Sequence, residues 1–173
     1  DKFEAKISGE VNQVSDSDDL GWTKDLMLNI PLTDDAAVRV NIGKESLGGF
    51  IDRIASYQLE DGQPALANPS DPVNSPGLFT SEDDVNDSET ESARIQFMLQ
   101  TDKAIIKLTH NYQESTSGGS QQGDINDELN SSALIAEDFE GKSNLSSFDL
   151  EYELGFATLT ANISNYDFEN EGA

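Results

Sequence analysis

The sequence predicts an all-β protein: an antiparallel up-and-down meander of about seven strands that forms an incomplete segment of a large transmembrane β-barrel. Apolar and polar residues alternate with a period of two along much of the chain, and helical periodicity is rare. Short and long connections between the predicted strands also alternate, so a meander places every short turn at one end, as in outer-membrane barrels. No run of about 18 apolar residues is present, so no transmembrane helix is predicted.

The first three strands are predicted at about 3–13, 22–32 and 37–45. In the first strand the odd positions are mostly apolar and the even positions polar, as expected for a strand with one apolar face. In the next two strands the even positions are apolar, and these are Leu26, Leu28, Ile30, Leu32, Val38, Val40 and Ile42. Pro31 cannot donate a ladder hydrogen bond, so a place beside a turn at a barrel rim suits it.

Four further strands are predicted at about 93–100, 104–113, 145–154 and 157–166. Each alternates again, and the apolar positions are Ile95, Phe97, Leu99, Ile106, Leu108, Tyr112, Phe148, Leu150, Tyr152, Leu154, Ala157, Leu159, Ala161 and Ile163. Residues 1–173 are therefore interpreted as one partial β-barrel domain.

The connections differ greatly in length. The short ones are 33–36, 101–103 and about 154–156, and the long ones are 12–21, about 53–92 and about 113–144. The long connections are rich in Ser, Asn, Asp, Gly and Gln, and residues 64–77 hold four of the five prolines, which indicates irregular backbone. Loops of thirty to forty residues are uncommon in a compact soluble domain, so we interpret 53–92 and 113–144 as outer loops.

Composition excludes several classes of function. The chain has 34 acidic and 10 basic residues, a formal charge of −24, so it lacks the basic face that nucleic acid or an anionic membrane surface would require. The absence of cysteine excludes disulfides, thiolate metal sites and cysteine nucleophiles. Because the sequence starts without an initiator Met or a signal peptide, we expect mature protein or a piece of a longer polypeptide.

Alternation by itself does not decide whether the apolar face contacts lipid or a protein core. Trp22 and Tyr112 lie near the long-loop ends of their strands and Phe156 lies at a short turn, as in the aromatic girdles of membrane barrels. Lys24 and Lys44 share the apolar face, where each could extend its ammonium group to the membrane interface. The alternative is a soluble, acidic, all-β extracellular domain that binds carbohydrate or calcium.

One stretch carries a family resemblance. The segment LNIPLTDDAAVRVNIGKESLGGFID resembles the early barrel strands of TonB-dependent outer-membrane receptors, with matches at Asn29–Leu32, Asp34–Asp35, Val38–Arg39 and Gly48–Asp52. The hairpins ARIQFMLQTDKAIIKLTHNYQES and SSFDLEYELGFATLTANISNYDF are also similar to that family. The family has an N-terminal plug domain, an energy-coupling box and a barrel of twenty-two strands. This sequence contains neither plug nor box.

The resemblance implies a location in the bacterial outer membrane and energised uptake of a scarce ligand, such as a ferric siderophore, cobalamin or an oligosaccharide. The implied partners are outer-membrane lipid, the remainder of the barrel and plug, and a TonB-type energy-coupling protein that would act through the plug region. The small-molecule ligand is not identified. An odd number of strands with two bare edges also predicts completion by further protein. A non-transporting structural or adhesive barrel is a third interpretation.

No catalytic, cofactor-binding or metal-binding residue is predicted, and we expect no enzyme activity. His110 is the single histidine and lies on the apolar face, where it is read as an interfacial or packed residue. Asp149, Glu151 and Glu153 share the polar face, and we expect them to pair with Arg39, Arg94 or Lys107. The acidic segments 81–91 and 123–128 lack the spacing of a calcium-binding EF-hand, and 116–123 lacks the helix and Lys of a phosphate loop. No ligand-binding residue is assigned.

Overall fold

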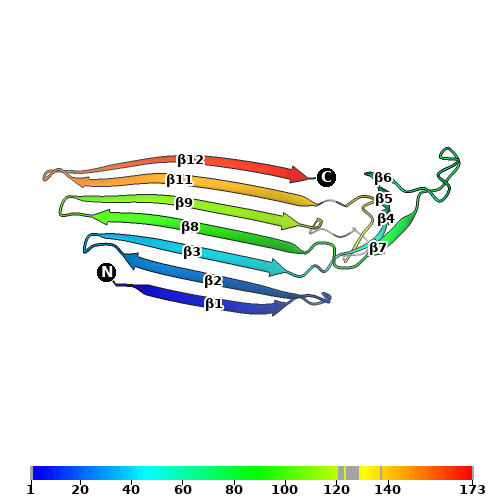
Figure 1. Ribbon diagram of the computed structural model, residues 1–173, viewed down its shortest axis with the longest axis horizontal. Coiled ribbons are helices and arrows are strands. Elements are labelled where there is room, and N and C mark those ends of the chain that lie inside the picture. Colours follow the sequence, from blue (N-terminus) through cyan, green and yellow to red (C-terminus); the bar gives the residue numbers. More distant parts are fainter. Residues whose placement is uncertain (1, 121–122, 124–128, 137, 173) are drawn as a thin grey trace.

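The computed structural model describes residues 2–120, 123, 129–136 and 138–172. It confirms an all-β fold built on a seven-stranded antiparallel meander (Figure 1). In spatial order the strands of this sheet are β1 (Glu4–Gln13), β2 (Leu20–Pro31), β3 (Ala36–Leu47), β8 (Ser88–Gln100), β9 (Ala104–Ser117), β11 (Phe139–Glu153) and β12 (Thr158–Gly172). Within the described residues there is no helix of a length and apolarity that could cross a membrane.

Three tight turns lie together at one end of the sheet, which we call the turn end, and the long connections lie at the other, the loop end (Figure 1). At each turn one backbone amide closes the hairpin: Leu32 N donates to Ala36 O, Thr101 N to Ala104 O and Leu154 N to Ala157 O, each at 2.8 Å. Gly155 has φ of +88°, a left-handed conformation that a residue without a Cβ adopts at little cost.

The strands reach further into the long connections than the sequence pattern predicts. β8 begins at Ser88 rather than near 93, and β11 begins at Phe139 rather than near 145. Apart from Phe139 and Gly141 the added residues are polar, so they show no period of two, but the ladder pairs Ser88 and Phe139 each with Ser117. Pairing with a neighbour, rather than local pattern, extends these strands.

The long connections also contain strands that the sequence analysis did not predict. β4 (Asp52–Tyr57) pairs with β7 (Phe79–Glu82) and with β10 (Asn130–Ser131) in a small sheet at the loop end. A second small sheet joins β5 (Leu59–Glu60) and β6 (Gln63–Pro64). The sequence predicts long loops at 53–92 and 113–144 and gives no indication of these strands, because short strands that pair over long sequence distances leave little local signal.

The register separates an apolar face from a polar face. One row across six strands is entirely apolar and consists of Ile30, Val38, Phe97, Leu108, Phe148 and Ile163. The row one residue away lies on the opposite face and is entirely polar, with Asn29, Arg39, Gln96, Thr109, Ser147 and Ser164. A one-residue slip of any strand would exchange its two faces, so burial of one face specifies the register.

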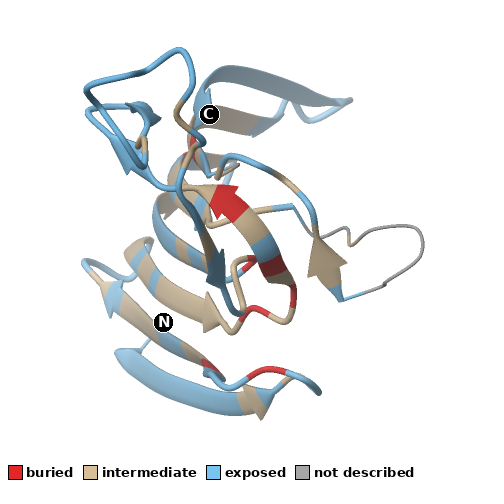
Figure 2. Ribbon diagram, turned by 90° about the vertical axis from the view of Figure 1, so that its right-hand side faces the viewer, coloured by how far each residue is buried: buried red, intermediate tan, exposed pale blue. Residues whose placement is uncertain are grey.

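The described residues contain almost no hydrophobic core. Ile51 is the buried hydrophobic residue, at 1% exposure, whereas Ile163 is 70% exposed and Ile95 is 50% exposed. Apart from Thr109, the buried residues lie towards the loop end, and several of them are in and around β4 (Figure 2). The main sheet is a single curved layer that does not close into a barrel, and no second described sheet covers its apolar face.

Candidate functional site

The polar face of the main sheet is concave. A hollow of about 720 Å³ lies on it over β8, β9, β11 and β12, and most of its lining residues have polar-face parity. A smaller hollow of about 310 Å³ lies on the same face over β1, β2 and β3. We call the larger hollow the central concavity. Its lining includes Arg94, Gln96, Lys107, Asp149, Glu151 and Asn162.

The acidic residues of β11 do not pair with bases as expected. Asp149 instead accepts hydrogen bonds from the Asn162 amide at 2.5 Å and from the Ser147 hydroxyl at 3.4 Å. The guanidinium of Arg39 donates to Asn29 Oδ1 at 3.3 Å. Among the described residues no ion pair joins Asp149, Glu151 or Glu153 to Arg39, Arg94 or Lys107, so that prediction is wrong.

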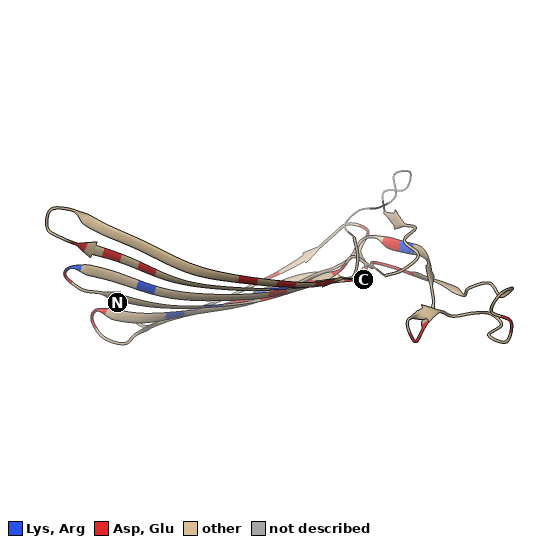
Figure 3. Cartoon of the chain, turned by 90° about the horizontal axis from the view of Figure 1, so that it is seen from above, with Lys and Arg blue, Asp and Glu red and all other residues tan. Residues whose placement is uncertain are grey.

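A row of charged residues borders the apolar face on its loop side. In strand order it consists of Lys24, Lys44, Glu91, Glu114, Lys142 and Glu169. Lys44 Nζ lies 2.8 Å from Glu91 and 3.2 Å from Glu89, and Lys142 Nζ lies 2.5 Å from Glu140. Lys24 Nζ lies 4.1 Å from the centre of the Trp22 ring. Charges and aromatics therefore mark where the apolar surface ends (Figure 3 shows the charged residues along the chain).

His110 lies on the apolar face beside a serine. Its Nδ1 is 2.9 Å from Ser146 Oγ, and the two residues are direct cross-strand partners. A nucleophilic serine needs a base that is itself oriented, usually by a carboxylate. The structure gives His110 no hydrogen bond to a carboxylate within the described part of the chain, so the geometry does not assemble a triad.

The loop end is held together around the segment Gly48–Asp52. Asn86 is 2% exposed, and its Oδ1 accepts hydrogen bonds from the amides of Phe50 at 2.6 Å and Ile51 at 2.8 Å. The Ile51 carbonyl oxygen accepts from Val85 N at 2.8 Å. A buried side chain that satisfies two backbone donors is costly to remove, so Asn86 fixes the start of the second long connection.

Hydrogen bonds that involve Asp18, Asp52 and Asp84, which we call the aspartate relay, link the three long connections to one another. The Asp52 carboxylate accepts from Asp84 N at 3.1 Å, and the Asp84 carboxylate accepts from Asp18 N at 2.8 Å. The Asp52 amide in turn donates to Leu129 O at 2.8 Å. Residues from all three connections thus meet at one point, which we call the loop junction. In the sequence Gly48–Asp52 is recognisable as a motif, but these contacts leave no signal there.

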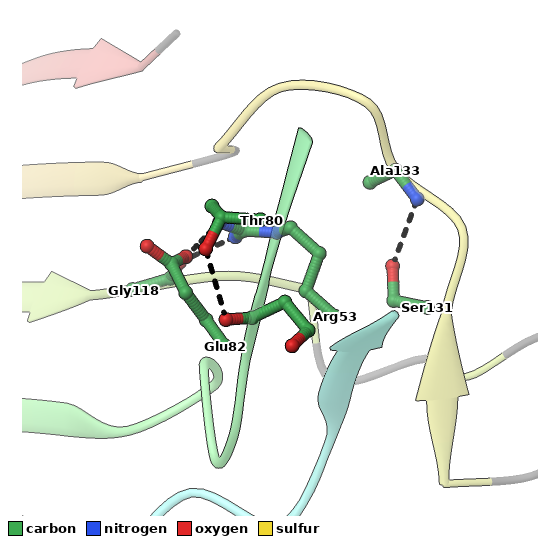
Figure 4. Close-up of polar contacts among 7 residues, drawn as sticks. Arg53, Thr80, Glu82, Gly118, Ser131 and Ala133 are labelled. Carbon is green, nitrogen blue, oxygen red and sulfur yellow. Dashed lines mark hydrogen bonds and ion pairs between the residues drawn. The ribbon is translucent and has the colours of Figure 1, made fainter. Parts of the chain in front are cut away.

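Arg53 is a buried base of the loop junction (Figure 4). It is 4% exposed, its Nη1 pairs with Glu82 at 2.8 Å, and its Nη2 donates to Gly118 O at 3.5 Å. Its Nε is buried without a hydrogen-bond partner. Arg53 thus joins β4 to β7 and to the end of β9. The sequence offered no signal for this, because a single arginine in a polar loop is usually solvated.

The acidic loop segments do not form a metal site in the described residues. No cluster of three or more His, Cys, Asp or Glu side chains that could hold a metal is found there. In the segment 81–91, Glu82 pairs with Arg53 and Asp84 takes part in the aspartate relay. In the segment 123–128, residues 124–128 lie outside the described part of the chain.

The raised pKa of Asp87 predicts a pH dependence for the loop junction. Burial is the largest cause that raises the pKa of this carboxyl, followed by the negative charges of Glu89, Asp19 and Asp138. The folded protein binds this proton more tightly than the unfolded chain does, so protonation of Asp87 stabilises the fold. This stabilisation is complete below the ordinary pKa of an aspartate in the unfolded chain, and it is lost as pH rises through the raised pKa of the folded state. We expect Asp87→Asn to increase protection of the Gly118 amide, which donates to Asp87 O, at neutral pH.

Hydrogen exchange between about pH 4 and 7, corrected for intrinsic rates, measures this effect. The matched control is Asp102→Asn, which removes an equal charge at the exposed turn end. Protection of Gly118 is expected to become less dependent on pH in the Asp87 variant and to keep its pH dependence in the control. Equal pH profiles for the wild-type protein and Asp87→Asn would contradict the assignment.

Comparisons of the chain with protein-family models, with curated proteins and with solved structures find no match. The candidate site therefore rests on its own geometry. It consists of the apolar face, the concave polar face with the central concavity, and the loop junction at the loop end of the sheet.

Proposed function

We propose that this chain is a wall segment of an outer-membrane receptor of the TonB-dependent type, which takes up a scarce small ligand. The apolar face would contact acyl chains, the polar concave face would line the interior, and the long connections would face the outside. The ligand class and the energy-coupling partner follow from the resemblance of residues 28–52 and are part of the proposal.

The observation that carries this proposal is the uncovered apolar face. It lies opposite a concave polar face, whereas a soluble sandwich buries the apolar faces of two sheets against each other. The described residues hold one buried hydrophobic side chain, Ile51, and leave many large apolar side chains exposed. Large exposed apolar patches mark contact surfaces, and an apolar band bordered by aromatic and charged residues suits lipid.

The two edges of the sheet support completion by further strands. Among the described strands, β1 pairs only with β2, and β12 pairs only with β11. Unpaired backbone donors and acceptors are not tolerated at membrane depth, so a membrane-embedded sheet must close. Because seven meander strands leave β1 and β12 running in the same direction, more strands are required for an antiparallel closure.

Membrane fractionation of the full-length polypeptide tests the proposal. The protein is expected to stay in the outer-membrane fraction after washes with urea and high salt, and to require detergent for extraction. It is also expected to migrate faster on unheated than on boiled gels, since folded barrels resist denaturation by the gel detergent. A peripheral membrane protein is the control for the washes. A monodisperse, detergent-free particle would overturn the proposal and favour the soluble carbohydrate- or calcium-binding domain.

A further inference from the structure

The central concavity holds charges of both signs that are not paired with each other. Arg94 on β8 and Lys107 on β9 line one side, and Asp149 and Glu151 on β11 line the other. Within the described residues the ion pairs are made by Lys44, Arg53 and Lys142, and none includes these four side chains.

In the central concavity the basic side chains come from β8 and β9, and the acidic side chains come from β11. The concave positions of β8 and β9 carry two bases and no acid; they are Ser88, Thr90, Ser92, Arg94, Gln96, Met98, Gln100, Ile105, Lys107, Thr109, Asn111, Gln113, Ser115 and Ser117. The acids of these two strands lie on the other face, where Glu89, Glu91 and Glu114 pair with lysines. In a chain with 34 acids and 10 bases, this leaves a local positive region on the concave face.

Lys107 and Asp149 are direct cross-strand partners, a position in which opposite charges usually attract. Both carboxylate oxygens of Asp149 are instead engaged along β11 and towards β12, by Ser147 and Asn162. The Lys107 ammonium is therefore left facing the concavity without a described partner. Between the charges lie neutral hydrogen-bonding groups, and the Gln96 amide nitrogen is oriented by Thr109 Oγ1 at 3.2 Å.

We propose that the central concavity binds a small zwitterion, a molecule that carries one carboxylate and one ammonium group. The carboxylate is held by Arg94 and Lys107, and the ammonium by Glu151, through charge-assisted hydrogen bonds. The volume of about 720 Å³ leaves room for a ligand of dipeptide size. This inference rests on the proposed function, in which the concave face lines the uptake path.

The loop end argues against a free anion as the ligand. The connections 14–19, 48–87 and 118–138 contain sixteen acidic residues and one base, Arg53, which is buried and ion-paired. Such a field repels anions and lowers their local concentration. A simple cation would pass, but it would leave Arg94 and Lys107 without a partner. A zwitterion satisfies both sides of the concavity and meets no net repulsion at the entrance.

Calorimetric titration of the full-length protein in detergent tests the proposal with three forms of one probe. These are the dipeptide Ala-Ala, its N-acetylated form, which is an anion, and its C-terminal amide, which is a cation. We expect Ala-Ala to bind at least about tenfold more tightly than either modified form, because each modification removes one charge-assisted contact.

Variants locate the site. Lys107→Gln and Glu151→Gln are each expected to weaken Ala-Ala binding by about fivefold or more. The matched control is Lys103→Gln, which removes a positive charge from the exposed turn between β8 and β9. Arg94→Gln provides a second test of the basic side if Lys107→Gln misfolds, and circular dichroism checks that each variant folds.

The inference would be overturned if the three probe forms bound with equal affinity, if a singly charged form bound best, or if Ala-Ala did not bind detectably. It would also be overturned if the Lys107 and Glu151 variants bound Ala-Ala as tightly as the control variant. The proposed function is judged separately. A protein that remains in the membrane but does not bind the dipeptide removes only the zwitterion site, whereas a soluble particle removes the proposed function itself.

Discussion

With the proposed lipid contact, replacing Ile163 by arginine is expected to destabilise the protein by up to about 2–4 kcal/mol, because a cation on the lipid face must lose most of its hydration. Ile163 lies on β12 in the fully apolar row and is 70% exposed on the isolated sheet. Unfolding by urea of the full-length protein in lipid vesicles measures the effect, together with the amount that reaches the outer membrane.

The neighbouring Ser164→Arg is the matched control. Ser164 is also exposed on β12 but belongs to the polar row of the concave face, so the proposed lumen would hydrate the new charge and the variant should fold normally. If the apolar face contacted water, both substitutions would lie on a solvated surface and would change stability by about 0.5 kcal/mol or less. Equal tolerance of Ile163→Arg and Ser164→Arg would therefore remove the lipid contact from the proposal.

Gly49→Ala is expected to open the loop junction. A Cβ at this position would lie 1.8 Å from Asp84 O and 2.9 Å from Asp87 N, both backbone atoms that cannot rotate away. The segments around Gly49 and Asp84 must then separate, which breaks the hydrogen bond from Val85 N to Ile51 O. Overpacking of this kind costs about 1–3 kcal/mol and occasionally more.

Hydrogen exchange of the Val85 amide and limited proteolysis of the long connections measure the opening. The matched control is Gly9→Ala in β1, where the nearest atom to an added Cβ is Thr23 O at 3.7 Å, an ordinary contact distance. The main sheet should keep its protection in both variants, because its ladders do not pass through the loop junction. Unchanged protection of Val85 in Gly49→Ala would contradict the assignment of Gly49 as a required close contact.

The candidate site was only partly predictable. The segment Gly48–Asp52 was recognisable as a motif, but its role in collecting three connections depends on Asn86 and on the aspartate relay. Neither is visible in sequence, because Asn and Asp in polar loops are usually solvated turn residues. The sequence also did not predict the unpaired charges of the central concavity. We expected the acids of β11 to form ion pairs with bases on other strands, but Asp149 accepts hydrogen bonds from Ser147 and Asn162 instead.

By itself the sequence determined the all-β class and which residues share each face of the sheet, because a period of two is a local property that each strand carries alone. The meander of seven strands followed from the alternation of short and long connections. Only the tertiary structure decided where β8 and β11 begin, where β9 and β12 end, that β4, β7 and β10 form a second sheet, and that Arg53 and Asn86 are buried. These features depend on pairing between residues far apart in the chain, so no local pattern encodes them.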